Sequence, residues 1–356
     1  MGIDIVSVII LLGILIFVHE LGHFLAAKAS GVGVLKFSLG FGPRLIGKKV
    51  GETEYRISAI PLGGYVRLFG ESGDEGLLPG DEKRSFQKQP VLKRIGIVAA
   101  GPFFNFLFAF LVLILIFMAG VPELTSRVGD VPEGTPASRA GIQKGDLIVS
   151  INDRPVSLWA DIVEHVHGSK GRELAIAVRR GDRELRFSVL PEAMKSQNLF
   201  GEEVESYKIG IMASTETVTH REGPFRAVVS AGAYTWSMTK LTVLSVVKMI
   251  EGVVSPKNLG GPILIAQMAG TQVRQGILPF IFFMAILSIN LGVLNLLPIP
   301  ILDGGHLLFY VIELVTGKEV NIRWRERAQQ VGFFLLILLM IFVFYNDIIR
   351  ILTPSE

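Results

Sequence analysis

The sequence predicts a polytopic α-helical membrane protein with about four transmembrane helices and a soluble insertion. Half of its 356 residues are hydrophobic, and the mean hydropathy is +0.49. That value is high for a water-soluble protein and ordinary for one with several membrane spans. The second observation is that the apolar residues gather in long runs, with a stretch of ordinary soluble composition between the second run and the third.

Three of these runs are long enough to cross a bilayer, which requires about 20 apolar residues. They cover residues 3–27, 95–120 and 277–297, and a shorter run at residues 331–349 can just span. The first run has no basic segment before it, so we expect it to be retained rather than cleaved as a signal peptide. Residues 225–254 are apolar but interrupted by charges, and we expect an amphipathic helix there, with a fifth span as the alternative.

The soluble insertion has the pattern of a small α+β domain. Residues 127–190 contain short alternating strands separated by Gly-Asp turns, and the stretch "ASRAGIQKGDLIVSINDRPV" resembles the core of a PDZ domain. We therefore predict four parts: residues 1–120 with two spans and a cytoplasmic β-hairpin loop, a PDZ-like domain at 121–195, a linker and amphipathic segment at 196–276, and the last two spans at 277–356.

Basic residues near the span ends predict the orientation, because cytoplasmic loops are enriched in Lys and Arg. Five such residues precede the second span closely, whereas two follow it. We expect the loop at residues 28–94 in the cytoplasm, and the PDZ-like domain and both termini on the outer side of the membrane.

Composition also excludes some partners and ligands. The net charge is only +3 and the basic residues do not form a patch of the kind that binds nucleic acid, so we expect no nucleic-acid partner. The chain has no cysteine, which excludes disulfides and thiolate metal sites. Any transition metal must therefore bind histidine and carboxylate groups.

The first apolar run carries the sequence "HELGH", with His19, Glu20 and His23. On a helix the two histidines share one face and can bind one metal ion, while Glu20 can act as a base beside it. The alternative is that these groups reach water near a span end. However, His19 lies roughly 24 Å along a helix that starts at Ile3, inside a bilayer core of about 30 Å. Ionisable groups at that depth are usually functional.

A catalytic zinc site usually has three protein ligands, so one more is required. Asp303, which ends an apolar run in "NLLPIPILDGGH", is one candidate, and His306 is another. Pro298 and Pro300 break a membrane helix just before Asp303. Irregular backbone at membrane depth occurs only where it is buried in protein or lines a cavity. The alternative is that Asp303 is a turn residue in Asp-Gly-Gly.

The two motifs together resemble the site-2 protease family of intramembrane zinc metalloproteases, in its bacterial regulator of sigma E protease branch. The likeness extends to "GFGP" at residues 40–43, "GPFFN" at 101–105, "NLGGPILIAQMAG" at 258–270 and the PDZ-like domain. One departure is that the best-known member of this branch carries two PDZ domains in tandem, whereas this chain has room for one. The resemblance also implies that the membrane is a bacterial inner membrane.

The resemblance implies specific roles. His19, His23 and Asp303 would bind Zn²⁺, and Glu20 would be the catalytic base. A substrate helix must unwind to expose its peptide bonds, and residues 54–69 predict a β-hairpin whose edge could pair with it. The expected substrate contacts are Tyr55, Ile57, Tyr65, Asn295, Pro298 and Pro300. Asn295 could instead be a buried amide that satisfies the helix break, and Asn105 is expected mainly to pack between helices.

The predicted function is cleavage of single-pass membrane proteins within the lipid bilayer. The expected substrate is an anti-sigma factor that has already been shortened, and remnant signal peptides are a second possibility. The PDZ-like domain could bind a peptide or act as a size barrier. Two alternatives stay open: a non-catalytic membrane scaffold that displays a PDZ domain, and a membrane-anchored metalloprotease that acts on water-soluble chains. The intact Glu20 favours an enzyme over a scaffold.

Overall fold

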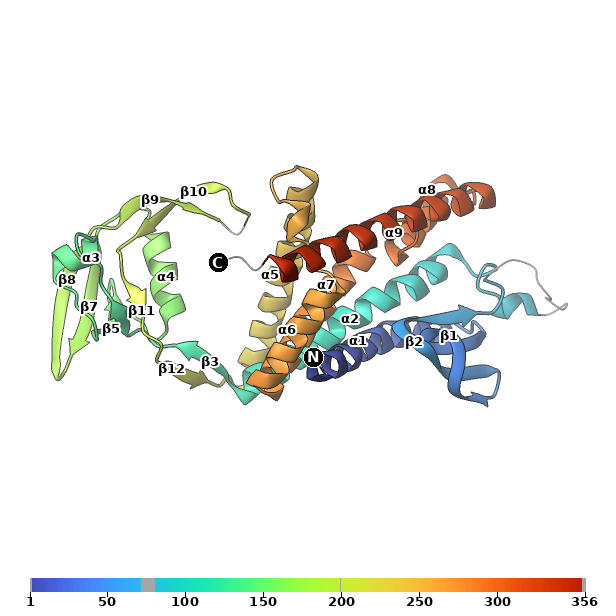
Figure 1. The fold of residues 1–356 in the computed structure, drawn as a ribbon, viewed down its shortest axis with the longest axis horizontal. Helices are drawn as coiled ribbons and strands as arrows, with labels where there is room; N and C mark the ends of the chain where they lie inside the picture. The colour runs from blue at the N-terminus through green and yellow to red at the C-terminus, as the bar shows by residue number, and fades with distance from the viewer. Residues whose placement is uncertain (1, 72–80, 199, 354–356) are drawn as a thin grey trace. The chain divides into compact units, whose positions relative to one another are not determined.

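The computed structural model describes residues 2–71, 81–198 and 200–353 (Figure 1). Within these ranges, four helices are long and apolar enough to cross a membrane. They are α1 (Gly2–Ala29), α2 (Val91–Ala119), α7 (Ile277–Asn295) and α9 (Ile322–Leu352). Less than half of the most apolar window of each helix is buried within the protein, which leaves apolar surface for lipid. The prediction of about four spans is confirmed.

Three further helices accompany the spans: α5 (Pro224–Ile250), α6 (Pro262–Gln275) and α8 (Asp303–Thr316). Helix α5 covers the segment predicted to be amphipathic, and it is not among the four span-like helices. It packs on α7, where Thr242 Oγ1 donates to Asn290 Oδ1 at 2.7 Å and the rings of Tyr234 and Phe282 lie 5.5 Å apart. Whether α5 lies at the membrane interface stays a prediction.

The chain divides into two compact units. The helical unit comprises residues 2–115, 228–247 and 255–353, and the second unit comprises residues 116–227 and 248–254. Each is described by itself.

The helical unit is packed around α1. An apolar cluster joins α1 to α6 and α7, with Leu11, Leu15, Ala269 and Phe280 among its buried members. The carboxylate of Asp347 on α9 is 1 % exposed and accepts three backbone N–H groups at the start of α6, at 3.0–3.1 Å. These N–H groups have no partner within their own helix, so Asp347 satisfies them and attaches α9 to α6.

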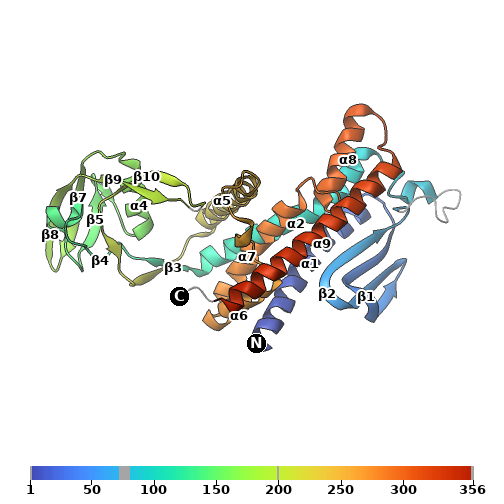
Figure 2. The same cartoon turned by 45° about the horizontal axis from the view of Figure 1, so that its top comes forward.

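Two long strands, β1 (Val34–Val50) and β2 (Thr53–Leu68), lie beside the C-terminal half of α1 (Figure 2). Each strand folds into two halves. Residues 36–39 face residues 64–67 on one side and residues 54–57 on the other. The resulting sheet therefore has residues 64–68 at one edge. The short 3-10 helix Asp81–Arg84 follows before α2.

The prediction that residues 54–69 form a hairpin by themselves is wrong. Their two halves are extended as expected, but residues 36–39 lie between them. Gly40 and Gly42 have φ values of 90° and 86°, which glycine adopts readily, and they let β1 reverse direction. The hairpin is formed instead by β1 and β2 together.

The second unit is the PDZ-like domain. Its core is a four-stranded sheet in the order β6-β5-β7-β8, flanked by two helices. Its elements are β3 (Val121–Leu124), β4 (Val128–Asp130), α3 (Pro136–Ala140), β5 (Leu147–Ile151), β6 (Arg154–Pro155), α4 (Trp159–Gly168), β7 (Leu174–Arg180), β8 (Arg183–Val189), β9 (Glu192–Gln197), β10 (Glu203–Lys208), β11 (Met212–Ala213) and β12 (Thr217–His220).

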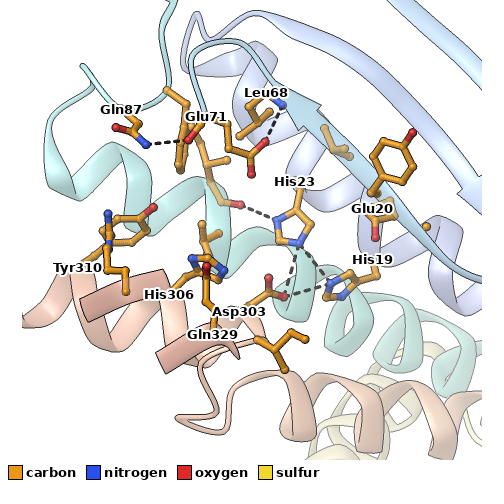
Figure 3. A pocket seen from close by; sticks show the side chains of 18 of the residues that line it. His19, Glu20, His23, Leu68, Glu71, Gln87, Asp303, His306, Tyr310 and Gln329 are labelled. Carbon is orange, nitrogen blue, oxygen red and sulfur yellow. Dashed lines mark hydrogen bonds and ion pairs between the residues drawn. The ribbon is translucent and has the colours of Figure 1, made fainter. Parts of the chain in front are cut away.

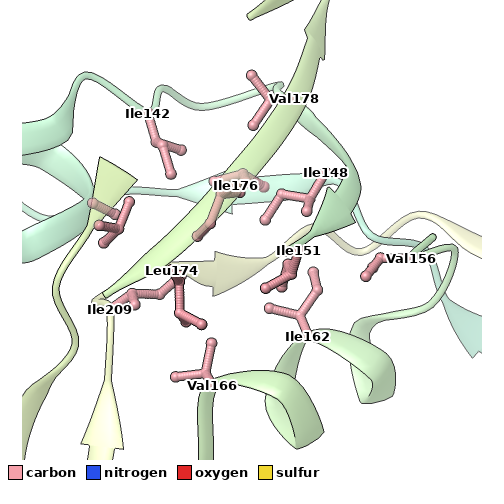
Figure 4. Packing of buried hydrophobic residues seen from close by; sticks show 13 residues of the cluster. Ile142, Ile148, Ile151, Val156, Ile162, Val166, Leu174, Ile176, Val178 and Ile209 are labelled. Atoms are coloured by element: carbon pink, nitrogen blue, oxygen red, sulfur yellow. The ribbon is translucent and has the colours of Figure 1, made fainter. Parts of the chain in front are cut away.

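Branched aliphatic side chains fill this domain (Figure 4). Ile148, Ile151 and Ile176 from the sheet pack against Ile162 and Val166 of α4. Ile209 belongs to the same core, and β11 and β12 pair with β4 and β3. These residues follow position 195, where we predicted the domain to end, because the chain returns to the edge strands only after the hairpin of β9 and β10.

Candidate metal centre

His19 and His23 lie one turn apart on the same face of α1. Their Nε2 atoms are 3.2 Å apart, and their side chains are 12 % and 13 % exposed. Apolar side chains surround the motif on α1, so the helix places two polar rings inside the protein rather than at a wet end. This is the i, i+4 geometry that the sequence predicts.

Asp303 reaches the two imidazoles from the start of α8. Its Oδ2 lies 3.1 Å from His19 Nε2 and 3.5 Å from His23 Nε2. The two glycines that follow it are buried, and a Cβ at Gly304 would lie 2.2 Å from the Leu297 carbonyl oxygen. The Gly-Gly pair is therefore required because the broken segment after α7 packs directly against the first turn of α8.

The three ligand atoms have the spacing of a zinc site. Atoms held about 2.0–2.1 Å from a tetrahedral zinc ion lie roughly 3.3 Å from one another. The observed separations are 3.1, 3.2 and 3.5 Å. Asp303 Oδ2 is buried, and among the described residues these two nitrogens are its close partners. The residues His19, His23 and Asp303 therefore fit a divalent cation in donor type as well as in distance.

Helix α2 packs against the two histidine rings. His23 Nδ1 lies 3.0 Å from the carbonyl oxygen of Ile97, which can only accept, so Nδ1 carries the proton and Nε2 keeps its lone pair. A Cβ at Gly101 would lie 2.3 Å from His23 Nε2 and 2.9 Å from His19 Cε1. Glycine at this position lets the α2 backbone approach both rings.

Glu20 lies beside the cluster and is buried, with 9 % of its surface exposed. Its side chain lies against β2. A Cβ at Gly64 would lie 3.0 Å from Glu20 Cγ, so glycine also allows this close approach of the strand. Figure 3 shows Glu20 on the β2 side of the two histidines.

A cavity of about 650 Å³ opens onto the cluster. Strand β2 forms one wall through residues 64–66 and Leu68, and α8 and α9 form another. The polar residues that line it are His19, Glu20, His23, Glu71, Gln87, Asp303, His306, Arg325, Glu326 and Gln329. A cavity lined by this many polar groups can admit water to the site.

Only one of the predicted substrate contacts lines the cavity. Tyr65 lines the cavity, whereas Tyr55 and Ile57 lie on β2 outside the set of lining residues and are 37 % and 49 % exposed. Asn295 ends α7, and Pro298 and Pro300 lie in the broken segment before Ile301, which does line the cavity. Their contacts with substrate stay predictions.

In the wall opposite β2, sequence reasoning named His306 only as an alternative metal ligand and missed Tyr310. His306 lines the cavity but is not part of the three-residue cluster. Tyr310 lies between two guanidinium groups, with Arg94 at 5.0 Å and Arg325 at 5.1 Å from its ring centroid. The positions of His306 and Tyr310 on one face of α8 were the available signal, since both follow Asp303 at helical spacing.

Comparison with known proteins identifies the family. The model of peptidase family M50 matches residues 7–339. A Campylobacter jejuni protein named as a zinc metalloprotease is 37 % identical over 355 residues, covering 99 % of this chain and 95 % of its own length. The regulator of sigma-E protease of Escherichia coli is 32 % identical over 449 aligned positions, covering 98 % of this chain and 99 % of its own length.

The second alignment is longer than the 356 residues of this chain, so the Escherichia coli protein carries additional residues inside the matched region. Among solved structures, the PDZ domain of an SdrC-like protein from Listeria monocytogenes matches 26 % of this chain and 87 % of its own, at 21 % identity and a TM-score of 0.21. The family match and the near-full-length relatives agree with the fold and with the zinc-type donor set. The chain belongs to peptidase family M50 and is an intramembrane zinc metalloprotease.

Proposed function

We propose that His19, His23 and Asp303 hold the zinc ion and that Glu20 is the general base for hydrolysis of peptide bonds in transmembrane segments. The observation that carries this proposal is the convergence of the three ligand atoms, 3.1–3.5 Å apart, with a buried carboxylate beside them on a membrane-spanning helix. A protein that only displayed its PDZ-like domain would not require a base at this position.

The chain's own groups divide the chemistry between them. Bound zinc supplies a Lewis acid that polarises the scissile carbonyl and lowers the pKa of the attacking water. Glu20 takes a proton from that water and delivers it to the leaving nitrogen. Glu20 lies against β2, on the side of the site where an unwound substrate would lie.

The edge of β2 supports the binding of an extended substrate. Residues 64–67 pair with residues 36–39 along one side, and the other side faces Glu20 and the cavity. An unwound segment added along this edge would satisfy its backbone groups by pairing with the strand. Tyr65 would contact it directly, Tyr55 and Ile57 would contact its flanks, and Asn295, Pro298 and Pro300 would contact its far side.

The natural substrate that we propose is a shortened anti-sigma factor, with remnant signal peptides as a second class. The basis is the likeness to proteins named regulators of sigma-E protease. The PDZ-like domain would bind a peptide or exclude bulky outer domains. The corresponding topology places residues 28–94 in the cytoplasm and the PDZ-like domain and both termini on the outer side of the inner membrane.

The functional test uses purified full-length protein in lipid vesicles with a tagged single-pass substrate and a water-soluble peptide of the same sequence. We expect the wild type to cut the membrane-embedded substrate, and Glu20→Gln to leave it uncut and bound. Cleavage of the soluble peptide alone would instead support a membrane-anchored protease of soluble chains. Binding by wild type with no cleavage of either substrate would support the scaffold.

The topology test exploits the absence of cysteine. A cysteine at Asp182, which is exposed in the turn between β7 and β8, should react with a membrane-impermeant maleimide in intact spheroplasts. A cysteine at Lys48 should react only after the membrane is opened. The reverse labelling pattern would contradict the proposed orientation.

A further inference from the structure

Asn105 on α2 contacts the first of the two histidines. It is fully buried, and its side-chain nitrogen Nδ2 lies 3.1 Å from His19 Nδ1. Its side-chain oxygen Oδ1 is buried without a hydrogen-bond partner among the described residues. Its backbone carbonyl accepts from Ser288 Oγ of α7 at 2.8 Å, which fixes the position of this part of α2. The Asn105 amide is therefore held against His19, but with its oxygen unsatisfied.

The two orientations of the amide select different forms of His19. If Nδ2 donates to Nδ1, the proton of a neutral imidazole lies on Nε2, and it points at the ligand cluster. If the amide turns by half a turn, Oδ1 accepts from Nδ1–H and Nε2 keeps a free lone pair. Only the second arrangement allows His19 to bind a cation.

We infer that Asn105 is a positioning residue for the metal: its side-chain oxygen accepts the Nδ1–H of His19 and holds the ring in the form whose Nε2 binds zinc. This inference rests on the proposed ligand set. It gives α2 the same task at both histidines, because the Ile97 carbonyl accepts from Nδ1 of His23. A backbone carbonyl serves one ring and a side-chain carbonyl serves the other.

A role in helix packing alone does not explain an asparagine here. A buried amide oxygen without a partner is destabilising, whereas leucine of similar size has no such penalty. Packing in this region is supplied by neighbours such as Gly101, which allows the close approach, and Ser288, which bonds the backbone. The side chain of Asn105 is directed at His19 instead.

The test is the zinc affinity of the full-length protein in detergent, measured by competition with a chromophoric chelator. Asn105→Asp keeps an acceptor of the same shape, and Asn105→Leu and Asn105→Ala remove it. Ser288→Ala is the matched control, since it removes a contact to Asn105 without touching the side chain. Loss of an outer partner of a metal ligand typically weakens binding about 10–100-fold.

We expect Asn105→Leu and Asn105→Ala to lose affinity by about that factor, and Asn105→Asp and Ser288→Ala to stay close to wild type. A higher zinc affinity in Asn105→Asp than in Asn105→Leu is diagnostic. If Asn105 only packed between helices, the buried charge of Asp would be the more damaging change, and the order would be reversed. Wild-type affinity in both Leu and Ala variants, or equal loss in the Asp and Leu variants, would overturn the inference.

Two controls keep these outcomes separate. Thermal unfolding of the zinc-free variants reports whether each one folds. If Asn105→Leu does not fold, the zinc affinities of Asn105→Asp and Asn105→Ala are compared instead. His19→Ala tests the ligand set itself. If His19→Ala binds zinc as the wild type does, the proposed site fails, whereas a loss in His19→Ala without a loss in Asn105→Leu refutes only the role of Asn105.

Discussion

Asp146 of the PDZ-like domain and Asp303 of the helical unit each hold a carboxylate oxygen away from water, and the two carboxylates have opposite surroundings. In the PDZ-like domain, Asp146 is 1 % exposed and fully paired: Arg180 donates to both oxygens at 2.7 and 2.8 Å, and the Gln143 N–H donates at 2.9 Å. In the helical unit, Asp303 Oδ2 faces two imidazole nitrogens and, among the described residues, forms no ion pair with lysine or arginine. One carboxylate is satisfied by the protein, and the other is arranged for a cation.

This difference separates a structural charge from a functional one better than burial does. A buried ionised group must be paired, because removing it from water costs several kcal/mol. Asp146 meets that requirement within its own domain. In the proposed site, Asp303 would meet it by sharing a metal ion with the two histidines. The predictions below test whether the two aspartates can be separated in this way.

The largest expected effect on stability is at Asp146. Replacing it with Asn removes the charge that pairs with Arg180 and should lower the free energy of unfolding of the PDZ-like domain by about 3 kcal/mol. Hydrogen exchange of the core strands in the full-length protein measures this, and zinc content is the control. Unchanged protection of β5 and β7, or a fall in bound zinc, would remove the distinction between the two aspartates.

The next effect concerns α2. Gly101→Ala introduces a Cβ that would lie 2.3 Å from His23 Nε2, so the rings must move. A displacement of about 1 Å at a catalytic site can reduce activity about 100-fold, and we expect zinc affinity to fall as well. Gly96→Ala is the matched control on the same helix, because no atom lies within 4 Å of its Cβ. Equal activity in the two variants would contradict the close packing of α2 on the ligands.

The sequence predicted which side chains come together in this cluster because the pattern is local. The pair His19 and His23 follows from one helical period, and Asp303 stands out as a charge at the end of an apolar run. Asn105 was harder to interpret. Its side chain faces either a helix neighbour or a ligand, and the sequence does not show which residue of α1 comes opposite.

A third prediction concerns the substrate. If cleavage requires an unwound segment along β2, helix-breaking residues near the scissile bond should speed it. Glycine costs a helix about 1 kcal/mol relative to alanine, and proline costs about 3. Since each 1.36 kcal/mol is tenfold in rate, a few substitutions should change cleavage about 10–100-fold. Spans rich in glycine and spans of leucine alone, compared at equal expression, provide the test. Equal rates would show that unwinding does not limit the reaction.

The smallest effect is expected for an exposed ion pair in the PDZ-like domain. Lys195 Nζ lies 3.0 Å from Glu203 Oε2, but the two side chains are 80 % and 67 % exposed. Such pairs contribute about 0–1 kcal/mol. Lys195→Ala should therefore barely change hydrogen exchange in β9 and β10. A loss of hydrogen-exchange protection as large as that expected for Asp146→Asn would mean that burial does not determine how much a charged pair stabilises this domain.

The fold was predictable to the extent that it depends on hydropathy. The four spans follow from run length, and the core strands β5, β7 and β8 follow from alternation. The path of β1 and β2 was not predictable, because it depends on a reversal at Gly40 and Gly42 and on pairing between segments that alternate equally well. The cavity wall on α8 was missed because its residues form a surface only when α8 packs beside α9.

The most direct test of the metal site is zinc per chain, measured by elemental analysis of purified Glu20→Gln and Asp303→Ala proteins beside the wild type, together with cleavage of one membrane substrate. If Glu20 serves the reaction and Asp303 serves the metal, both variants lose cleavage, but only Asp303→Ala loses zinc. Near-stoichiometric zinc in Asp303→Ala would remove Asp303 from the ligand set. Retained cleavage in Glu20→Gln would remove the general base, and with it the proposed mechanism.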